Sequence, residues 1–389
     1  MTRVLRFAID HYLFLPGGAA VALIWANTGP ASYFTFSHRL SFMVNDIGMA
    51  LFFALMTREV VEAAAPDGTL HTWRRMLLAV ASASGGSLGA VLAYFGYLQM
   101  GDERSVLAPG WPIVCATDIA FTYFVARNIC SQAVIPFLLL TAIVSNAIGL
   151  VVLELRYPIG EVHAGAGIAL LMVALTAAIV MRRCDVRSFW PYVVVSGAIS
   201  WFGLFLTGLH PALALVPIVP FLPRTSRTRG FMVDAPLGAR DALSRFHRTG
   251  KYPGHVVLFI FGLTNAGVVL RGIGTGTWAI AIAAIVGRPA GTLLALAVAV
   301  AVGLRLPRHV NWRDMIVVAL VSSTGFTFAL FFATVAFPVG PVLNEAKLGA
   351  LLTVGVSALA TVAAKVLHVG RFAERAARRR APAPGYAGV

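Results

Sequence analysis

Long apolar runs recur along the whole 389-residue chain and constrain its fold more than any other feature. The hydrocarbon core of a bilayer is about 30 Å thick, so a helix needs about 20 mostly apolar residues to cross it. We predict about twelve such segments, all helical because lipid does not tolerate open strand edges. Their approximate ranges are 11–27, 40–57, 76–98, 111–126, 133–154, 162–181, 189–206, 209–222, 254–270, 277–303, 313–336 and 345–367.

The composition supports this all-α membrane class. Hydrophobic residues make up 58% of the chain and charged residues 12%, whereas a soluble domain carries about 25% charged residues. A soluble chain of this length would divide into about two or three domains, but lipid can solvate the exterior of one large helical bundle. We therefore predict a single transmembrane domain over residues 1–370. The basic tail at 371–389 is expected to be disordered.

The distribution of Lys and Arg predicts the orientation in the lipid bilayer. An even number of helices places both termini on one side, and most Lys and Arg residues lie in the loops of that side. Cytoplasmic loops carry the excess of these residues, so both termini and the long polar linker at 224–251 are predicted to be cytoplasmic. The formal net charge of +15 then mainly anchors these loops. Because the basic residues are spread over many loops, we exclude nucleic acid as a partner.

Metal-binding and catalytic groups are sparse in the sequence. The cysteines Cys115, Cys130 and Cys184 have no paired spacing, which favours neither a disulfide framework nor a zinc site. No Ser/His/Asp set or metal-spaced histidine cluster is evident, and His210 is interpreted as a helix-end residue. We therefore expect no enzyme activity and no cofactor. A secondary transporter is the leading hypothesis. A non-transporting sensor or scaffold is the alternative from another class, and an intramembrane enzyme ranks third.

Two ionisable residues lie deep inside apolar runs, Asp118 and Arg288. A charge at the centre of a spanning helix costs at least ~2.5 kcal/mol on insertion scales, and such residues mark functional sites by default. Asp118 could instead only cap a short interrupted helix, and Arg288 could be a structural counter-ion. We favour a deep pair of opposite charges.

The local sequence around these charges predicts two broken helices. "CATDIAF" sets Thr117 and Asp118 in the middle of the fourth run, and "SSTGFTF" does the same for Ser322–Phe328 in the eleventh. Ser, Thr, Asp and Gly favour helix caps over helix interiors. Each break exposes a partial positive N-terminus and a partial negative C-terminus, which a nearby Asp and Arg would neutralise.

These motifs resemble the NhaA family of sodium/proton antiporters, and the resemblance covers about residues 10–368. The matching stretches occur in the family's order: "WANTGP", "VNDIGMALFF", "ATDIAF", "WFGLFLTGLHPALA", "LTNAGV", "GRPAG", "VNWRDMIVV", "STGFTFALFFATVAF" and "EAKLGALL". The resemblance implies an inverted-repeat transporter fold. Helices three to five would be related to helices ten to twelve, and the unwound helices four and eleven would cross. The core helices would then be about 76–154 and 277–367.

The resemblance also implies an activity and its residues. The expected activity is antiport of Na⁺ against H⁺ by alternating access in a bacterial-type inner membrane. Asp118 matches the family's unwound-helix aspartate and would be the Na⁺ site, with Thr117 as its neighbour. Arg288 stands where the family usually has a lysine. Asp46 and Glu59 match acidic positions flanking the second helix, as candidates for a gate and for the cytoplasmic pH response.

One departure from the family changes the chemistry. The family's fifth helix carries two adjacent aspartates that bind the ion and the protons, and Ser145 and Asn146 stand in their place. Serine and asparagine offer oxygen atoms but take up no proton near neutral pH. The Arg288 guanidinium stays charged, whereas a buried lysine can release its proton. We therefore expect weakened or altered ion coupling. A changed substrate, either a small anion or a polar organic solute, is the alternative.

A few further residues receive structural interpretations. Gly85 and Gly86 are predicted to allow close helix packing, and Asn265 and Gly267 to form hydrogen bonds across the bundle. For Asn45 and its neighbour Asp46, two interpretations stand side by side: a helix cap and a gate. The resemblance also implies a homodimer, although the connection at 28–40, where the family often carries its dimerising hairpin, is short.

Overall fold

The computed structural model describes residues 14–63, 73–101, 103–156, 163–224, 241–270, 272–306 and 310–373. All regular secondary structure in these ranges is helical. Six of the described helices are long and apolar enough to cross a membrane, and a seventh span results if one bent pair counts as one. The all-helical membrane class is confirmed at this level, and the count of twelve helices stays a prediction.

The contacts divide the chain into two compact units. The first unit comprises Met1–Trp73, Ala147–Gly274 and Leu330–Leu348, and the second comprises Arg74–Asn146, Thr275–Ala329 and Gly349–Val389. The helices α8, α15 and α16 each contribute residues to both units.

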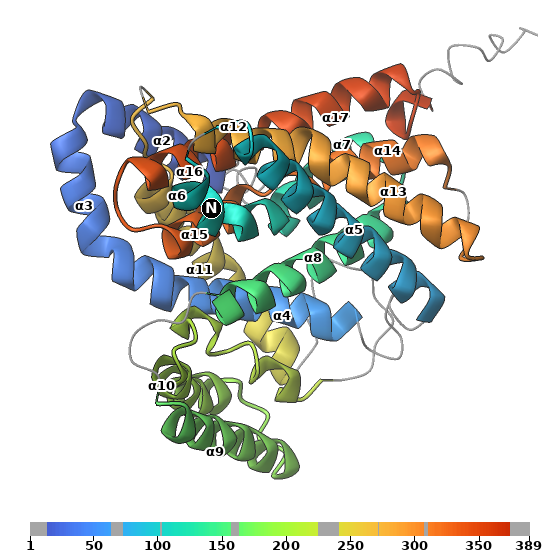
Figure 1. The fold of residues 1–389 in the computed structure, drawn as a ribbon. Coiled ribbons are helices and arrows are strands. Elements are labelled where there is room, and N and C mark those ends of the chain that lie inside the picture. Colours follow the sequence, from blue (N-terminus) through green and yellow to red (C-terminus); the bar gives the residue numbers. More distant parts are fainter. Residues whose placement is uncertain are drawn as a thin grey trace, which may run out of the picture. The chain divides into compact units, whose positions relative to one another are not determined.

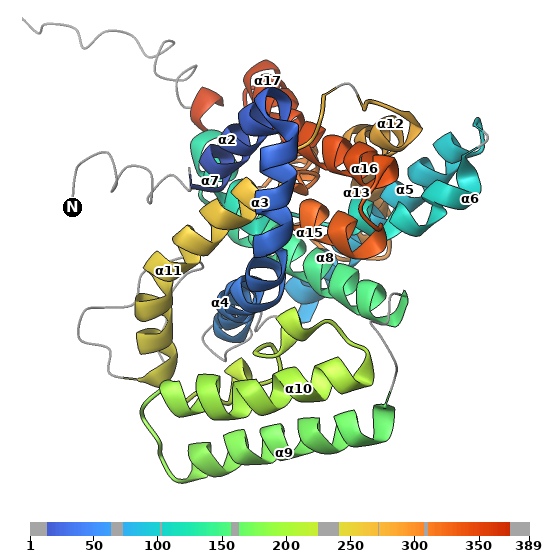
Figure 2. The same ribbon diagram turned by 90° about the vertical axis from the view of Figure 1, so that its left-hand side faces the viewer.

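In the first unit, two pairs of helices pack closely. The helix α2 packs on α11, and α9 lies beside α10 (Figures 1 and 2). A Cβ atom added to Gly262 would lie 2.7 Å from the Leu15 carbonyl oxygen, and one added to Gly167 would lie 2.7 Å from that of Gly203. Small residues therefore bring these backbones together. The elements that lie wholly in this unit are α2 (Phe14–Thr28), α3 (Pro30–Phe42), η1 (Met43–Gly48), α4 (Met49–Ala63), α9 (Ala164–Arg183), η3 (Tyr192–Ser196), α10 (Gly197–Thr207), η4 (Pro211–Leu213), η5 (Val219–Phe221) and α11 (Ala242–Asn265).

In the second unit, α5 packs against α13 through small residues (Figure 1). A Cβ atom on Gly85 would lie 2.7 Å from the Gly291 carbonyl oxygen, and one on Gly86 would approach Thr292. The predicted close packing at Gly85 and Gly86 is confirmed. The elements that lie in this unit, wholly or in part, are α5 (Trp73–Leu98), α6 (Arg104–Leu107), η2 (Ala108–Cys115), α7 (Ile119–Ile129), α8 (Ile135–Arg156), α12 (Thr275–Ile282), η6 (Ala283–Gly287), α13 (Arg288–Ala301), α14 (Trp312–Val321), α15 (Phe326–Ala336), α16 (Pro341–Leu352) and α17 (Gly355–Val366).

Both predicted breaks are present in the second unit. The fourth run forms η2, passes through the non-helical residues 116–118 and resumes as α7. The eleventh run breaks between α14 and α15, which meet at 43°. The two breaks touch each other, because Asp118 N donates to the Thr324 carbonyl at 2.7 Å. A further interruption, at Thr353 and Val354 between α16 and α17, was not predicted.

Three sequence predictions were wrong in detail. The run at 209–222 forms only the short 3₁₀ turns η4 and η5, because its prolines lack the backbone N–H that a helix interior needs. The connection at 28–40 is mostly helical, as part of α3. The linker at 224–251 is helical from Ala242, where α11 begins. Most of the basic tail, 374–389, lies outside the described residues.

Candidate functional site at the crossing of the broken helices

Asp118 is the N-cap of α7 and is fully buried. Its Oδ1 accepts a hydrogen bond from Phe121 N at 2.9 Å. Its Oδ2 accepts one from Thr327 N at 3.0 Å and one from the Thr327 hydroxyl. Thr327 is the second residue of α15, so one carboxylate holds the positive ends of two half-helices. This pairing offsets part of the cost of burying the charge.

Arg288 serves the opposite end of the same break. It is 2% exposed and directly follows the π-helical turn η6, a kind of irregularity that is frequent at functional sites. Its Nη1 donates to the carbonyls of Val114 at 2.9 Å and Ala116 at 2.8 Å, and its Nη2 donates to the Thr117 hydroxyl. A cation is favourable where helical carbonyls end. The two deep charges therefore neutralise the two polarities that the break in the fourth helix exposes.

Thr117 and Asn146 complete this network. The Thr117 hydroxyl donates to the Ser322 carbonyl at 3.0 Å, and Thr117 N donates to Asn146 Oδ1 at 2.9 Å. Only an oxygen can accept this N–H, so the hydrogen bond fixes the orientation of the Asn146 amide. The Nδ2 atom of Asn146 therefore points away from Thr117 N. Asn146 Nδ2 is buried and has no hydrogen-bond partner among the described residues.

Ser145 lies next to Asn146 on α8 and is 1% exposed. Its Oγ, like Asn146 Nδ2, has no partner among the described residues. Buried polar groups are rarely left unpaired, and each exception calls for a bound molecule or another explanation. The structure thus brings Asp118, Thr117, Asn146 and Arg288 into one network. Ser145 is adjacent to that network in the chain and shows no hydrogen bond to the other four residues.

The groups around Asp118 determine which ligands a bound ion would have. Within the described ranges, no three His, Cys, Asp or Glu side chains gather as a metal site. A Na⁺ at Asp118 would therefore take its other ligands from hydroxyl and carbonyl oxygens. It would also compete with the donors of Phe121 and Thr327 that already point at the carboxylate. Thr327 was missed by the residue predictions, although it lies in the quoted "SSTGFTF" stretch.

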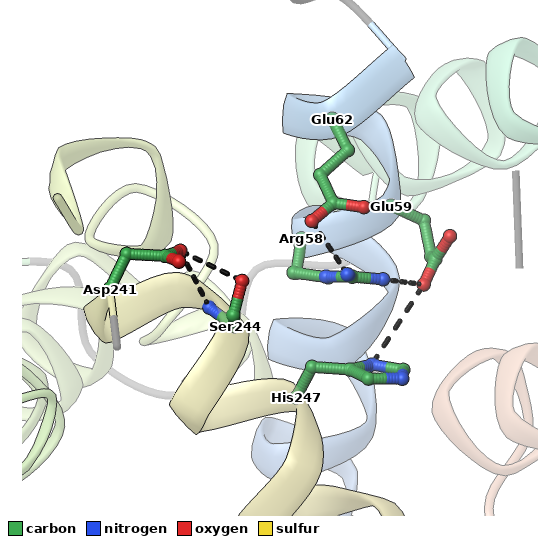
Figure 3. Close-up of polar contacts among 6 residues, drawn as sticks. All are labelled: Arg58, Glu59, Glu62, Asp241, Ser244 and His247. Carbon is green, nitrogen blue, oxygen red and sulfur yellow. Dashed lines mark hydrogen bonds and ion pairs between the residues drawn. The ribbon is translucent and has the colours of Figure 1, made fainter. Parts of the chain in front are cut away.

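A second cluster of charges lies in the first unit, on α4 and α11 (Figure 3). Arg58 Nη1 lies 2.5 Å from Glu59 Oε1, and Arg58 Nη2 lies 2.6 Å from Glu62 Oε1. His247 Nδ1 lies 4.0 Å from the same oxygen of Glu59. Arg58 and Glu59 are 1% and 3% exposed. We call these four residues the Glu59 cluster. Of these four residues, the sequence predicted only Glu59, because the sequence does not show which side chains lie beside it in space.

The remaining predicted residues lie mostly in the first unit. Asn265 Nδ2 donates to Asn45 Oδ1 at 2.9 Å, and Gly267 N donates to the Tyr33 hydroxyl oxygen at 2.9 Å, which confirms the hydrogen bonds across the bundle. Asn45 pairs with Asn265 rather than capping a helix. Asp46 lies in the π-helical turn η1, is half-buried, and forms no hydrogen bond or ion pair with the described residues.

His210 behaves as predicted. Its Nδ1 accepts a hydrogen bond from Ala212 N at 3.2 Å, so it caps the 3₁₀ turn η4. The cap satisfies a backbone donor that the first turn of a helix leaves without a partner. This contact supports its interpretation as a helix-end residue.

Comparison with known proteins places this geometry in context. The model of the family described as "Na+/H+ antiporter 1" matches residues 12–365. The Na⁺/H⁺ antiporter NhaA 1 of Pelobacter propionicus is 35% identical over 382 residues, which cover 96% of this chain and all of that protein. The Na⁺/H⁺ antiporter NhaA of Geobacter sulfurreducens is 37% identical over 371 residues, 92% of this chain and 96% of that protein.

One solved structure has a similar fold. It is the sodium proton antiporter MjNhaP1 of Methanocaldococcus jannaschii at pH 8, with a TM-score of 0.57 and 92% coverage of each chain. The sequence identity is 14%, so this likeness concerns the fold alone.

Proposed function

Because the chain belongs to the Na⁺/H⁺ antiporter 1 family, we propose that it exchanges Na⁺ for H⁺ through Asp118. The family consists of transporters and not of enzymes. The observation that carries the proposal is the fully buried Asp118 carboxylate, which touches both broken helices. A proton and a cation would compete for this group, and either would weaken the contacts that the carboxylate makes with α7 and α15.

The coupling should be weaker than in a site with two more carboxylates. Asn146 Oδ1 already accepts the Thr117 N–H, and as an uncharged amide oxygen it holds a cation less strongly than a carboxylate would. Arg288 keeps a permanent positive charge beside Thr117. With one titratable carboxylate at the crossing, the site can exchange one proton for one Na⁺. We therefore propose electroneutral exchange.

A second candidate function follows from the unpaired donors. Asn146 Nδ2 and Ser145 Oγ, both buried, have no partner among the described residues. Together they suit a ligand that accepts hydrogen bonds, such as a small anion or a polar organic solute. Binding of a panel of anions to the purified protein, compared with Na⁺ binding, distinguishes this candidate from cation exchange.

The regulatory residues of the proposal lie in the first unit. Glu59 is a candidate for the pH response, because its buried carboxylate contacts Arg58 and lies near His247. Asp46 is a candidate gate, because it is a half-buried carboxylate in a π-helical turn. We further propose an inner-membrane location with both termini cytoplasmic, and a homodimer.

Transport by purified protein in proteoliposomes tests the proposal. An imposed Na⁺ gradient should drive proton flux, and Asp118→Asn should abolish that flux. Asp185→Asn is the matched control, since Asp185 is an exposed carboxylate that pairs only with Arg187 among the described residues. Absence of Na⁺-driven flux in the parent, with anion binding present, would favour the second candidate.

A further inference from the structure

Each broken helix in the second unit is held by a side chain from the helical span that follows it. Asn146 of α8 accepts a hydrogen bond from Thr117 N, 29 residues before it in the chain. Thr353, just after α16, accepts one from Gly325 N at 3.2 Å, 28 residues before it. The two contacts have the same chemistry and almost the same spacing, as expected if the two halves of the chain are inverted repeats.

The chemistry of Thr353 suits an acceptor. Its hydroxyl donates to the Ala350 carbonyl at 2.6 Å, which leaves the oxygen lone pairs for Gly325 N. Thr353 is 3% exposed and lies in the interruption between α16 and α17. One turn later, Ser357 Oγ lies 3.2 Å from Thr324 Oγ1. The helices α7, α14 and α17 pack together here (Figure 1).

Gly325 lies between two contacts that reach Asp118. The carbonyl of Thr324 accepts the Asp118 N–H at 2.7 Å, and Thr327 donates to the Asp118 carboxylate. A Cβ atom added to Gly325 would lie 3.0 Å from the Ala116 carbonyl oxygen, so the two breaks approach closely. Loss of the Thr353 oxygen would leave Gly325 N buried without an acceptor and loosen the start of α15. The donors of Thr327 would then lose their fixed direction.

We infer that Thr353 is a positioning residue for Asp118, the counterpart in the second half of the chain of Asn146. It binds no ion itself and acts through Gly325 and Thr327. Its effect on transport rests on the proposed function, whereas its effect on the break does not. Loss of the Thr353 oxygen should therefore change both the amide hydrogen exchange of the backbone at the break and the transport of Na⁺.

Four variants of the full chain in lipid nanodiscs test the inference. Thr353→Val keeps the shape and removes the oxygen, and Thr353→Ser keeps the hydroxyl. Thr361→Val is the matched control, because the Thr361 hydroxyl donates to the Ser357 carbonyl on its own helix. Amide hydrogen exchange is measured for peptides covering 320–330 and 112–122. Thr353→Val should speed exchange in 320–330 about fivefold, the effect of one hydrogen bond. It should have a smaller effect on 112–122, which contacts this break through Asp118 N and the Thr324 carbonyl.

Asn146→Ala should give the mirror result, with the larger acceleration of exchange in 112–122. In proteoliposomes, Thr353→Val should raise the KM for Na⁺ about fivefold, with a smaller change in maximal flux, and Thr353→Ser should restore the parent value. Unchanged exchange in 320–330, or equal acceleration across the whole chain, would overturn the inference. If the parent shows no Na⁺-driven flux, the proposed function fails and the exchange measurement alone decides.

Discussion

The charges at the broken helices and those of the Glu59 cluster are stabilised in different ways. At the broken helices, Asp118 and Arg288 are held mainly by backbone groups at helix ends and by threonine hydroxyls. In the Glu59 cluster, Arg58 is held directly by the two carboxylates of Glu59 and Glu62. A charge held by backbone dipoles stays paired only while the breaks keep their geometry. A charge held by other charged side chains responds chiefly to their protonation. We propose that the first arrangement serves transport and the second serves regulation.

Restoring the acidic pair should have the largest effect on activity. We expect Ser145→Asp and Asn146→Asp, combined with Arg288→Lys, to raise pH-dependent Na⁺/H⁺ exchange well above the weak exchange of the parent. An aspartate at 146 can still accept the Thr117 N–H, and two adjacent carboxylates raise the pKa of one of them toward the working range. The measurement is Na⁺-driven proton flux in proteoliposomes.

The triple variant would give the transport site two carboxylates and one cation beside Asp118, a composition like that of Arg58, Glu59 and Glu62. The control is Asp118→Asn in the same background, which should abolish the gain. A folded triple variant with no more flux than the parent would favour the changed substrate.

Removing the deep cation should have the largest effect on stability. Arg288→Met would leave the Val114 and Ala116 carbonyls without their donor. Each buried acceptor left without a donor costs about 1–3 kcal/mol, so we expect a loss of about 2–6 kcal/mol in the free energy of unfolding. Thermal unfolding in detergent measures it, with Arg288→Lys as the variant that keeps the charge. A loss below about 1 kcal/mol, the typical size of one neutral hydrogen bond, would contradict this role.

The same change in the other cluster should cost less. Arg58→Met leaves Glu59 buried, but Glu62 is 34% exposed and water can solvate its carboxylate. We expect a loss of about 2 kcal/mol in the free energy of unfolding, below the range for a fully buried pair. Adding Glu59→Gln should recover part of this loss, since it removes the buried negative charge that Arg58 balances in the parent. A double variant as unstable as Arg58→Met would show that Arg58 acts through packing instead of charge.

A change at Thr327 separates the positioning of Asp118 from its charge. Thr327→Val removes the hydroxyl that donates to Asp118 and keeps the backbone N–H contact. One lost hydrogen bond to a charged group corresponds to about 1.5–3 kcal/mol at most, so folding should persist while Na⁺-driven flux falls. Thr334→Val serves as the control, because the Thr334 hydroxyl donates to the Phe331 carbonyl on its own helix. Equal flux in both variants would remove Thr327 from the site.

The sequence predicted the breaks because their chemistry is local. Thr117 and Asp118 are capping residues in an apolar run, and the structure places the start of α7 directly after them. The acceptors could not be predicted in this way. The role of Asn146 Oδ1 depends on where Thr117 lies in space. Thr353 is one ordinary threonine in an apolar run of the sequence, and its contact with Gly325 is visible only in the structure.

The errors also have a physical cause. Apolar content favoured a helix over 209–222, but prolines cannot supply the N–H groups of a helix interior. The polar start of α11 looked like a loop because it lacks an apolar run, although Asp241 caps it by accepting Ser244 N at 3.1 Å. Hydropathy detects membrane-spanning segments and is insensitive to where a helix continues beyond them.

Charge movement tests the central claim most directly. The purified parent protein is reconstituted in proteoliposomes, a Na⁺ gradient is imposed, and the membrane potential is recorded with a voltage-sensitive dye while proton flux is measured. With Asp118 as the single carboxylate that exchanges Na⁺ for H⁺, proton flux should occur without any potential, and Asp118→Asn should remove the flux. A membrane potential generated by Na⁺-driven exchange would contradict the account, because it requires more than one proton for each Na⁺.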